Sequence, residues 1–280
     1  MKKLKYLLLG VILLLTGCFN NDSMDNIEIT TTVYPFEYVA SYLYGKHSKI
    51  SSIYPKDTEI SDFNITNVLL KQYSNTDLYI FNGLTSEKNY IEKIKKDNNT
   101  LKIIDVTSNI NYNYSIEELW LDPNNLLTIA NNMKKGFNEY IRSTYLKNEI
   151  NEHYENLKVE LTNLDGKYYS TVKKASINTI VVSDDAFKYL EKYGLNVISI
   201  DMDTAKEKDI ELAKEALDNN NYLFIKYKEE DNDNITKVIN GNTKKVELYT
   251  LTNLIDINIE KNDYMVLLNE NLENIKQVIY

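Results

Sequence analysis

From residue 27 onward, short apolar runs alternate with segments in which apolar residues recur every three or four positions. Apolar or β-branched runs, which are typical of strands, lie at residues 27–33, 50–54, 78–81 and 101–106. The segments with helical spacing between and beside them cover residues 36–44, 67–73 and 86–97. Strands that alternate with helices predict an α/β lobe built on a parallel sheet.

The same alternation restarts in the second half of the chain. Strand-like runs lie at residues 179–182, 196–200, 222–225 and 245–249. Helical spacing covers residues 185–193, 205–218, 232–240 and 264–280. We therefore predict a second α/β lobe over residues 170–280, after a first lobe over residues 27–143.

Two helices stand between the lobes. Asp122-Pro123 opens the first, because Asp suits the N-cap and Pro the first helical position. The second is predicted over residues 144–166, where Gly166 stands at the place of a C-terminal cap. A helix of about 20 residues is about 30 Å long, enough to reach from one lobe to the other. The predicted fold class is α/β, with two α/β lobes and parallel-type sheets joined by a long connecting helix.

The first residues have the pattern of a signal peptide. Three lysines precede an apolar run at residues 7–15, which is shorter than the roughly 20 residues that a membrane span needs. Leu15-Thr16-Gly17-Cys18 follows and resembles the bacterial lipobox. We predict a signal peptide over residues 1–17 and a lipidated tether over residues 18–26, with lipid on Cys18. The alternative is an uncleaved anchor helix in which the cysteine is incidental.

Composition excludes several classes of function. The net charge is −9, and no basic block lies beyond the first residues, so nucleic acid is not expected as a partner. The two histidines, His47 and His153, lie on segments with the pattern of a solvated surface, and the chain has no Ser-His-Asp, Gly-x-Ser-x-Gly or Cys-His nucleophile set. We therefore do not expect an enzyme.

Several short motifs occur in a characteristic order. They are Thr32-Val33-Tyr34-Pro35-Phe36, Tyr54-Pro55-Lys56-Asp57, Asn82-Gly83 with Glu87, Trp120-Leu121-Asp122-Pro123, Asp185-Ala186-Phe187 with Tyr193-Gly194-Leu195, and Tyr264 with Asn271-Leu272. Together they resemble the metal-binding solute receptors of zinc and manganese ABC importers, which are adhesin-type lipoproteins with a rigid helix between two lobes. The resemblance implies a membrane-anchored extracytoplasmic monomer that binds its solute between the lobes and delivers it to a permease with a separate ATPase.

The resemblance also implies where metal ligands would stand. The family holds its metal with histidines and carboxylates from four loops. The corresponding positions are Ser61, Glu118, Asp184 and the neighbourhood of Asn253, and the first, second and fourth placements could shift by one or two residues. Asp62 is a further candidate at the first loop. Asp184-Asp185, at a strand end before a helix, also has the usual pattern of an N-cap.

No histidine falls on any of these four positions, which limits the chemistry. Zinc sites in proteins use His nitrogen or Cys sulfur, whereas carboxylate, hydroxyl and amide oxygens suit harder ions such as Mn²⁺, Mg²⁺ or Ca²⁺. A divalent ion held by oxygen alone is therefore one hypothesis, with Mn²⁺ favoured over Zn²⁺. The other is that metal binding is lost and that the chain is a receptor for another solute, or a surface adhesin or scaffold.

Overall fold

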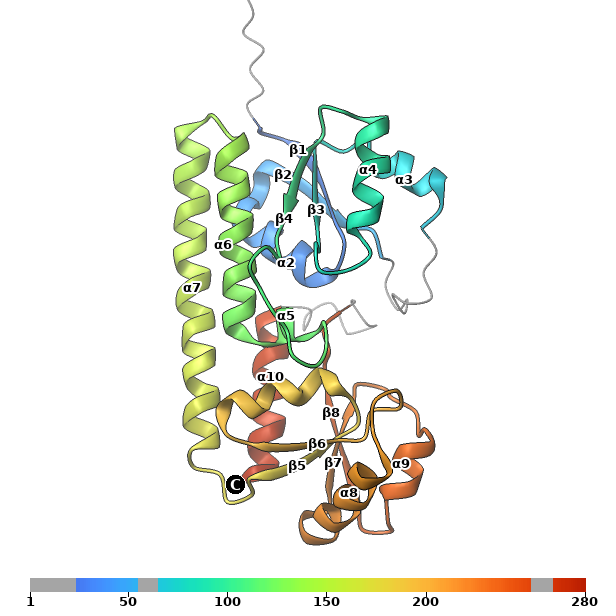
Figure 1. The fold of residues 1–280 in the computed structure, drawn as a ribbon. Helices are drawn as coiled ribbons and strands as arrows, with labels where there is room; N and C mark the ends of the chain where they lie inside the picture. The colour runs from blue at the N-terminus through green and yellow to red at the C-terminus, as the bar shows by residue number, and fades with distance from the viewer. Residues whose placement is uncertain (1–23, 55–64, 253–263) are drawn as a thin grey trace, which may run out of the picture.

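The computed structural model describes residues 24–54, 65–252 and 264–280, which form two lobes at opposite ends of a long helix (Figure 1). Cys18 and the predicted signal peptide lie outside the described residues, so the lipid anchor stays a prediction. No helix within the described ranges is long and apolar enough to cross a membrane.

The first lobe contains a parallel sheet of four strands in the order β2-β1-β3-β4. The strands are β1 (Ile27–Thr31), β2 (Ser48–Ser52), β3 (Leu78–Phe81) and β4 (Lys102–Asp105). The helical segments of this half are α2 (Tyr34–Tyr44), η1 (Gly45–His47), α3 (Asn67–Tyr73) and α4 (Lys88–Asp97). A short helix, α5 (Glu118–Leu121), then lies between the lobes (Figure 1).

The second lobe repeats this topology with the order β6-β5-β7-β8, again all parallel. Its strands are β5 (Thr179–Val182), β6 (Asn196–Ser199), β7 (Tyr222–Lys226) and β8 (Lys244–Leu248). Its helices are η3 (Asp185–Tyr193), which is a 3-10 helix, α8 (Glu207–Asn220), α9 (Asp233–Val238) and α10 (Tyr264–Ile279). The predicted class of two α/β lobes with parallel sheets is confirmed.

Two helices form a hairpin along one side of both lobes, α6 (Pro123–Tyr140) and α7 (Thr144–Val172) (Figure 1). Asp122 caps α6 as predicted, accepting a hydrogen bond from the Asn124 N–H at 2.8 Å. The predicted end of the connecting helix at Gly166 is wrong, because α7 continues to Val172. A glycine inside a helix costs only about 1 kcal/mol. Buried side chains beyond Gly166, such as Tyr168 stacked on Tyr193 at 4.9 Å between ring centroids, outweigh that cost.

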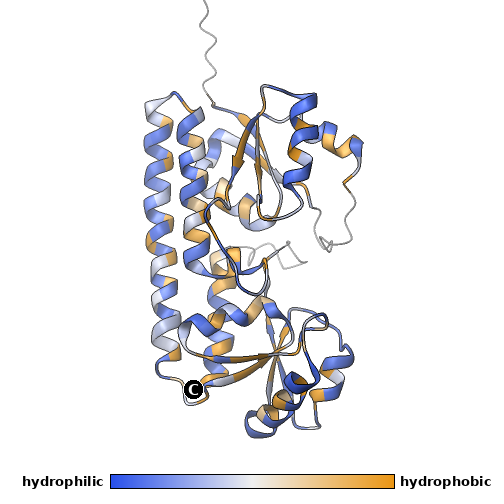
Figure 2. Ribbon diagram, viewed as in Figure 1, coloured by the Kyte–Doolittle hydropathy of each residue, from blue (hydrophilic) through white to orange (hydrophobic). Residues whose placement is uncertain are grey.

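The hydrophobic core runs without a break from one lobe into the other. A single cluster of buried side chains joins the first sheet, the helical hairpin and part of the second lobe, and a smaller cluster lies under α8 and α9. Figure 2 shows the matching pattern, with hydrophobic residues on the strands and polar residues on the outer helix faces. The lobes are therefore joined by packing as well as by the chain.

Candidate functional site

The strand order places a topological switch point in each sheet, between β1 and β3 and between β5 and β7. In open α/β sheets, ligands bind beyond the carboxyl ends of the strands at such a point. In the second lobe, Val182 is paired with Phe224 in the parallel register. Two residues further along the chain from this pair, Asp184 lies just beyond β5 and Lys226 is the last residue of β7.

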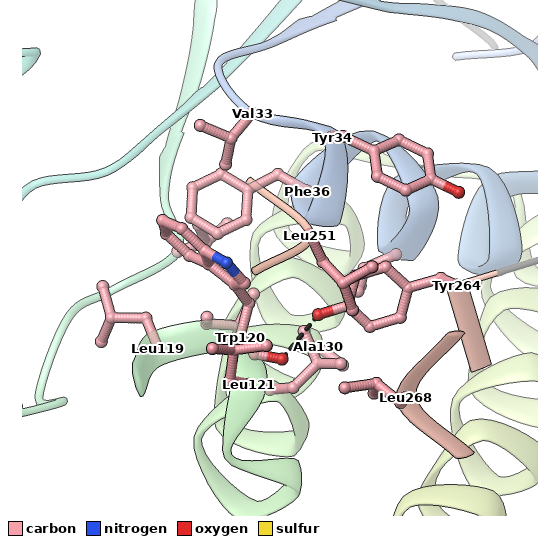
Figure 3. Packing of buried hydrophobic residues seen from close by; sticks show 14 of the residues in the cluster. Val33, Tyr34, Phe36, Leu119, Trp120, Leu121, Ala130, Leu251, Tyr264 and Leu268 are labelled. Carbon is pink, nitrogen blue, oxygen red and sulfur yellow. Dashed lines mark hydrogen bonds between the residues drawn. The ribbon is translucent and has the colours of Figure 1, made fainter. Parts of the chain in front are cut away.

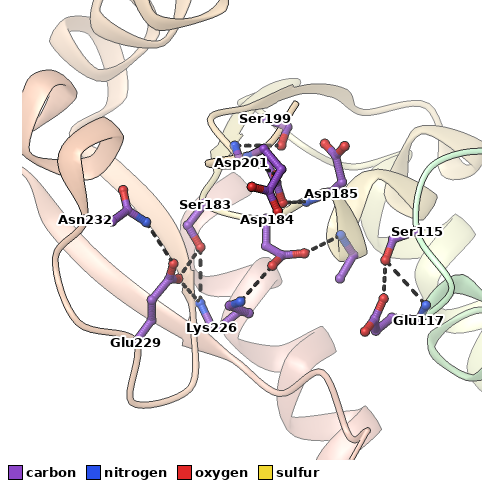
Figure 4. A network of polar contacts seen from close by, with 12 residues as sticks. Ser115, Glu117, Ser183, Asp184, Asp185, Ser199, Asp201, Lys226, Glu229 and Asn232 are labelled. Atoms are coloured by element: carbon purple, nitrogen blue, oxygen red, sulfur yellow. Dashed lines mark hydrogen bonds and ion pairs between the residues drawn. The ribbon is translucent and has the colours of Figure 1, made fainter. Parts of the chain in front are cut away.

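Asp184 uses both carboxylate oxygens within its own lobe. One oxygen accepts a hydrogen bond from the Ala186 N–H at 2.7 Å and caps η3, as its sequence pattern predicted. The other lies 2.9 Å from the Lys226 ammonium (Figure 4). The residue at the third ligand position is thus an N-cap and one half of an ion pair.

Glu118 is buried, and its carboxylate faces the backbone of its own loop. One oxygen accepts hydrogen bonds from the N–H groups of Tyr114 at 2.6 Å and Ser115 at 3.2 Å. The other accepts from the Asn113 N–H at 3.1 Å. Three converging donors that carry partial positive charge make this carboxylate a stabiliser of the loop at residues 113–115 and oppose the approach of a cation.

Glu117 is the residue before the predicted ligand Glu118. Figure 4 shows it with Ser115 in the same region as the Asp184–Lys226 pair. Burial is the main cause that raises the pKa of this carboxyl. The hydrogen bond from the Ser115 hydroxyl counteracts burial, and the charges of Asp184 and Lys226 raise and lower the pKa respectively. Glu117 lies one position before the predicted ligand Glu118, within the shift of one or two residues that the placement of this loop allowed. Lys226 had no signal in the sequence, because a lysine at a strand end is ordinary.

The remaining predicted ligands cannot be placed. Ser61, Asp62 and Asn253 lie outside the described residues, and their roles stay predictions. Within the described ranges no three His, Cys, Asp or Glu side chains gather closely enough to hold a metal ion.

The two histidines have structural partners. His47 lies between Asp25 at 2.7 Å and Glu149 at 3.0 Å, and the hydrogen bond to Asp25 is the main cause that raises its pKa. The Nδ1 of His153 lies 2.9 Å from the Leu43 carbonyl oxygen. Both contacts hold α7 against the first lobe.

The switch point of the first lobe contains a buried carboxyl of a different kind. Glu87 is 4% exposed and accepts a hydrogen bond from the Asn82 N–H at 2.8 Å, just after β3. Burial raises its pKa to about 7. The hydroxyl of Tyr79 is buried in this half and has no hydrogen-bond partner among the described atoms.

An apolar interface fixes the two switch points relative to each other (Figure 3). Trp120 on α5 packs edge-on against Phe36 of the first lobe, with the ring centroids 6.3 Å apart. Its indole N–H donates to the Thr250 carbonyl at 2.9 Å, and its own carbonyl accepts from the Tyr264 hydroxyl at 2.5 Å. Nearby, Lys192 bridges Asp122 at 2.7 Å and Asp165 at 2.9 Å.

Known structures share this architecture. The zinc-bound AdcA of Streptococcus pneumoniae is 16% identical, with a TM-score of 0.72 over 91% of this chain and 58% of that one, so this chain spans just over half of AdcA. The metal-dependent lipoprotein YcdH of Bacillus subtilis is 17% identical, with a TM-score of 0.72 over 91% and 99%. The laminin-binding protein Lbp of Streptococcus pyogenes is 18% identical, with a TM-score of 0.73 over 91% and 100%.

Sequence comparison gives the family. A search of curated proteins finds no match. The family model described as zinc-uptake complex component A, periplasmic, matches residues 29–278, nearly all of the chain beyond the predicted tether. The chain therefore belongs to this family of extracytoplasmic solute-binding components of ABC importers, as its motifs predicted.

Proposed function

We propose that this chain is the lipid-anchored receptor of an ABC importer, and that its solute binds between the carboxyl ends of the two sheets. Membership of the family over residues 29–278 supports the receptor role, and the lipobox-like sequence before Cys18 supports the anchor. The receptor acts as a monomer that delivers its solute to a permease, while a separate ATPase drives transport. In this proposal the two lobes that hold the solute are residues 27–143 and residues 170–280.

We further propose that this receptor has lost the metal binding of its family. The observation that carries this is the occupation of both described ligand carboxylates: Glu118 by three backbone N–H groups, and Asp184 by an N–H and an ammonium. These donors already satisfy much of the negative charge of each carboxylate, and the Lys226 ammonium would repel a metal ion that approached Asp184. Zinc sites use histidines, and the two in this chain, His47 and His153, hold α7 against the first lobe instead.

Thermal unfolding of the purified mature protein tests the loss of metal binding. We expect no saturable rise in melting temperature with Zn²⁺, Mn²⁺ or Ca²⁺. A receptor at 100 times its dissociation constant would gain about 2.7 kcal/mol of stability. A gain of that size would contradict the proposal, and a gain with Mn²⁺ but not Zn²⁺ would instead favour the oxygen-only site that includes Ser61, Asp62 or Asn253.

The receptor role needs its own experiment. Cells that express the chain with a C-terminal tag are labelled with a palmitate analogue, and the membrane fraction is cross-linked and probed for an ABC permease. We expect label on wild type and none on Cys18→Ala, and a cross-linked permease in wild type. Labelled protein that cross-links to no permease would contradict the receptor role and favour the adhesin or scaffold alternative.

A further inference from the structure

We propose that the Lys226 ammonium is a tethered cation that stands in the place of a divalent ion at Asp184 and thereby excludes such ions from the binding region. This inference rests on the proposed binding region between the sheets and explains why that region has lost metal. The observation behind it is the pairing of Lys226 with Asp184 at 2.9 Å, at the switch point of the second sheet.

The backbone of the sheet brings the two residues together. β5 and β7 are hydrogen-bonded neighbours with Val182 beside Phe224, and Asp184 and Lys226 are each two residues further along the chain from this pair. The Lys226 N–H donates to the Glu229 carboxylate at 2.9 Å, which fixes the end of β7 (Figure 4). Lys226 therefore starts from a fixed point and reaches Asp184 without any movement of the lobes.

The charges around the ammonium are those that would surround a bound cation. Asp184 contacts it at 2.9 Å, and Glu117 and Ser115, at the start of α5, are drawn in the same region in Figure 4. Glu117 is half-buried and has the Ser115 hydroxyl as its hydrogen-bond donor. The carboxylate of Asp184 is thus neutralised by a positive charge that the chain itself supplies.

An ammonium at this point works against a divalent ion in two ways. It occupies the oxygen of Asp184 that does not cap η3, and its like charge repels a cation at short range. Lysine is a compact point charge on a flexible stem, so it can fill a cation position that no rigid group would reach. The carboxylates that remain are oxygen donors suited to hard ions.

Removing the ammonium should therefore make a weak site for a hard cation. Lys226→Met keeps the apolar stem and deletes the charge, which leaves Asp184 without its cation. We expect Mn²⁺ to bind this variant at least tenfold more tightly than wild type, as measured by the room-temperature EPR signal of free Mn²⁺ during titration. Ca²⁺ should compete with the bound Mn²⁺.

Two control variants separate the inferred site from a general change of charge. Lys245→Met deletes a lysine of the same lobe that is paired with Asp231, and no gain in Mn²⁺ affinity is expected. Asp184→Asn combined with Lys226→Met should lose the gained affinity. A gain in the Lys245 variant, or a gain that persists in the double variant, would overturn the inference, as would the absence of any gain in folded Lys226→Met.

A measurement on wild type decides the inference even if no Lys226 variant folds. In protein carrying ¹³C-labelled aspartate, the Asp184 carboxylate resonance, assigned from Asp184→Asn, should stay sharp while Mn²⁺ is added. Selective broadening of that resonance at low Mn²⁺ concentration would overturn the inference. Saturable Mn²⁺ binding that leaves Asp184 sharp would contradict the proposed loss of metal binding but would leave the exclusion by Lys226 intact.

Discussion

The two lobes have the same strand order, yet the carboxyl group near each switch point has a different environment. In the first lobe Glu87 is buried beside the Asn82 N–H, and burial raises its pKa to about 7. In the second lobe the Asp184 side chain, 18% exposed, lies beside the Lys226 ammonium. Burial favours the neutral, protonated form of Glu87, whereas the Lys226 ammonium stabilises the ionised form of Asp184.

The difference shows that a fold which places carboxyl groups at the ends of two sheets does not by itself make a metal site. A carboxylate coordinates a metal best when it is ionised and no cation of the protein itself is paired with it. The pKa of Glu87 of about 7 favours partial protonation near neutral pH, and Asp184 is paired with the Lys226 ammonium. The local partners of each carboxyl therefore decide its chemistry, while the topology decides only its position.

The largest effect should come from breaking the interface that holds the two switch points together. Trp120→Ala removes a fully buried indole, its edge-on contact with Phe36 and its hydrogen bond to the Thr250 carbonyl. Large-to-small changes of this kind cost about 4 kcal/mol. We expect a loss of that size in the free energy of unfolding measured in urea.

Trp120→Phe is the matched control for this change. It keeps an aromatic ring against Phe36 and deletes only the indole donor to Thr250, so it should cost about 1 kcal/mol for the lost hydrogen bond and some packing. Equal losses in the two variants would show that the hydrogen bond, rather than packing, joins the lobes.

A pH titration of stability tests the first switch point. The pKa of Glu87 rises from 4.5 in the unfolded chain to about 7 in the folded one, so the folded state binds the proton more tightly. Its contribution to stability is complete below pH 4.5 and is lost as the pH rises toward 7. At about 1.4 kcal/mol per pKa unit, the loss is about 3 kcal/mol.

Glu87→Gln should remove this dependence, because the amide does not titrate and its oxygen still accepts from the Asn82 N–H. The measurement is the difference in free energy of unfolding between variant and wild type at pH 4.5, 6 and 7.5, which cancels the other titrating groups. A difference that stays constant over this range would contradict the raised pKa of Glu87.

A somewhat smaller effect is expected at Glu118, and it separates a structural role from a ligand role. Glu118→Ala leaves the N–H groups of Tyr114, Ser115 and Asn113 without their acceptor, which should cost about 2 kcal/mol of unfolding free energy. Glu118→Gln keeps one carbonyl oxygen and should cost less. If Glu118 were a ligand, both variants would instead lose metal binding with little change in stability.

The fold was predictable where burial imposes a simple pattern. Leu78–Phe81 and Thr179–Val182 have the predicted bounds because strands buried on both faces are continuous apolar runs. The end of α7 was not predictable, because Gly166 has the local pattern of a cap and the contacts of Tyr168 that override it come from residues distant in the sequence.

The candidate site was predictable only in outline. The motif around Asp184 located the end of β5, and its N-cap pattern was confirmed. The partner of Asp184 was not predictable, since the pairing of β5 with β7 depends on the strand order of the sheet rather than on any local sequence signal. Glu117 and Glu118 are both acidic, and only the direction of each side chain separates the two roles.

The smallest effect is expected at the second switch point, from Asp184→Asn. Asparagine caps a helix about as well as aspartate, so the hydrogen bond from the Ala186 N–H is retained and only the pairing with Lys226 is lost. Partly exposed ion pairs contribute less than about 1 kcal/mol, and salt screens them. The free energy of unfolding should therefore fall by less than that amount in dilute buffer, and the difference from wild type should shrink in high salt. Asp184→Ala, which also loses the cap, should cost about 1 kcal/mol more at either salt concentration. If the two variants were equally destabilised, the capping hydrogen bond would contribute nothing, and the position of Asp184 would depend on its charge alone.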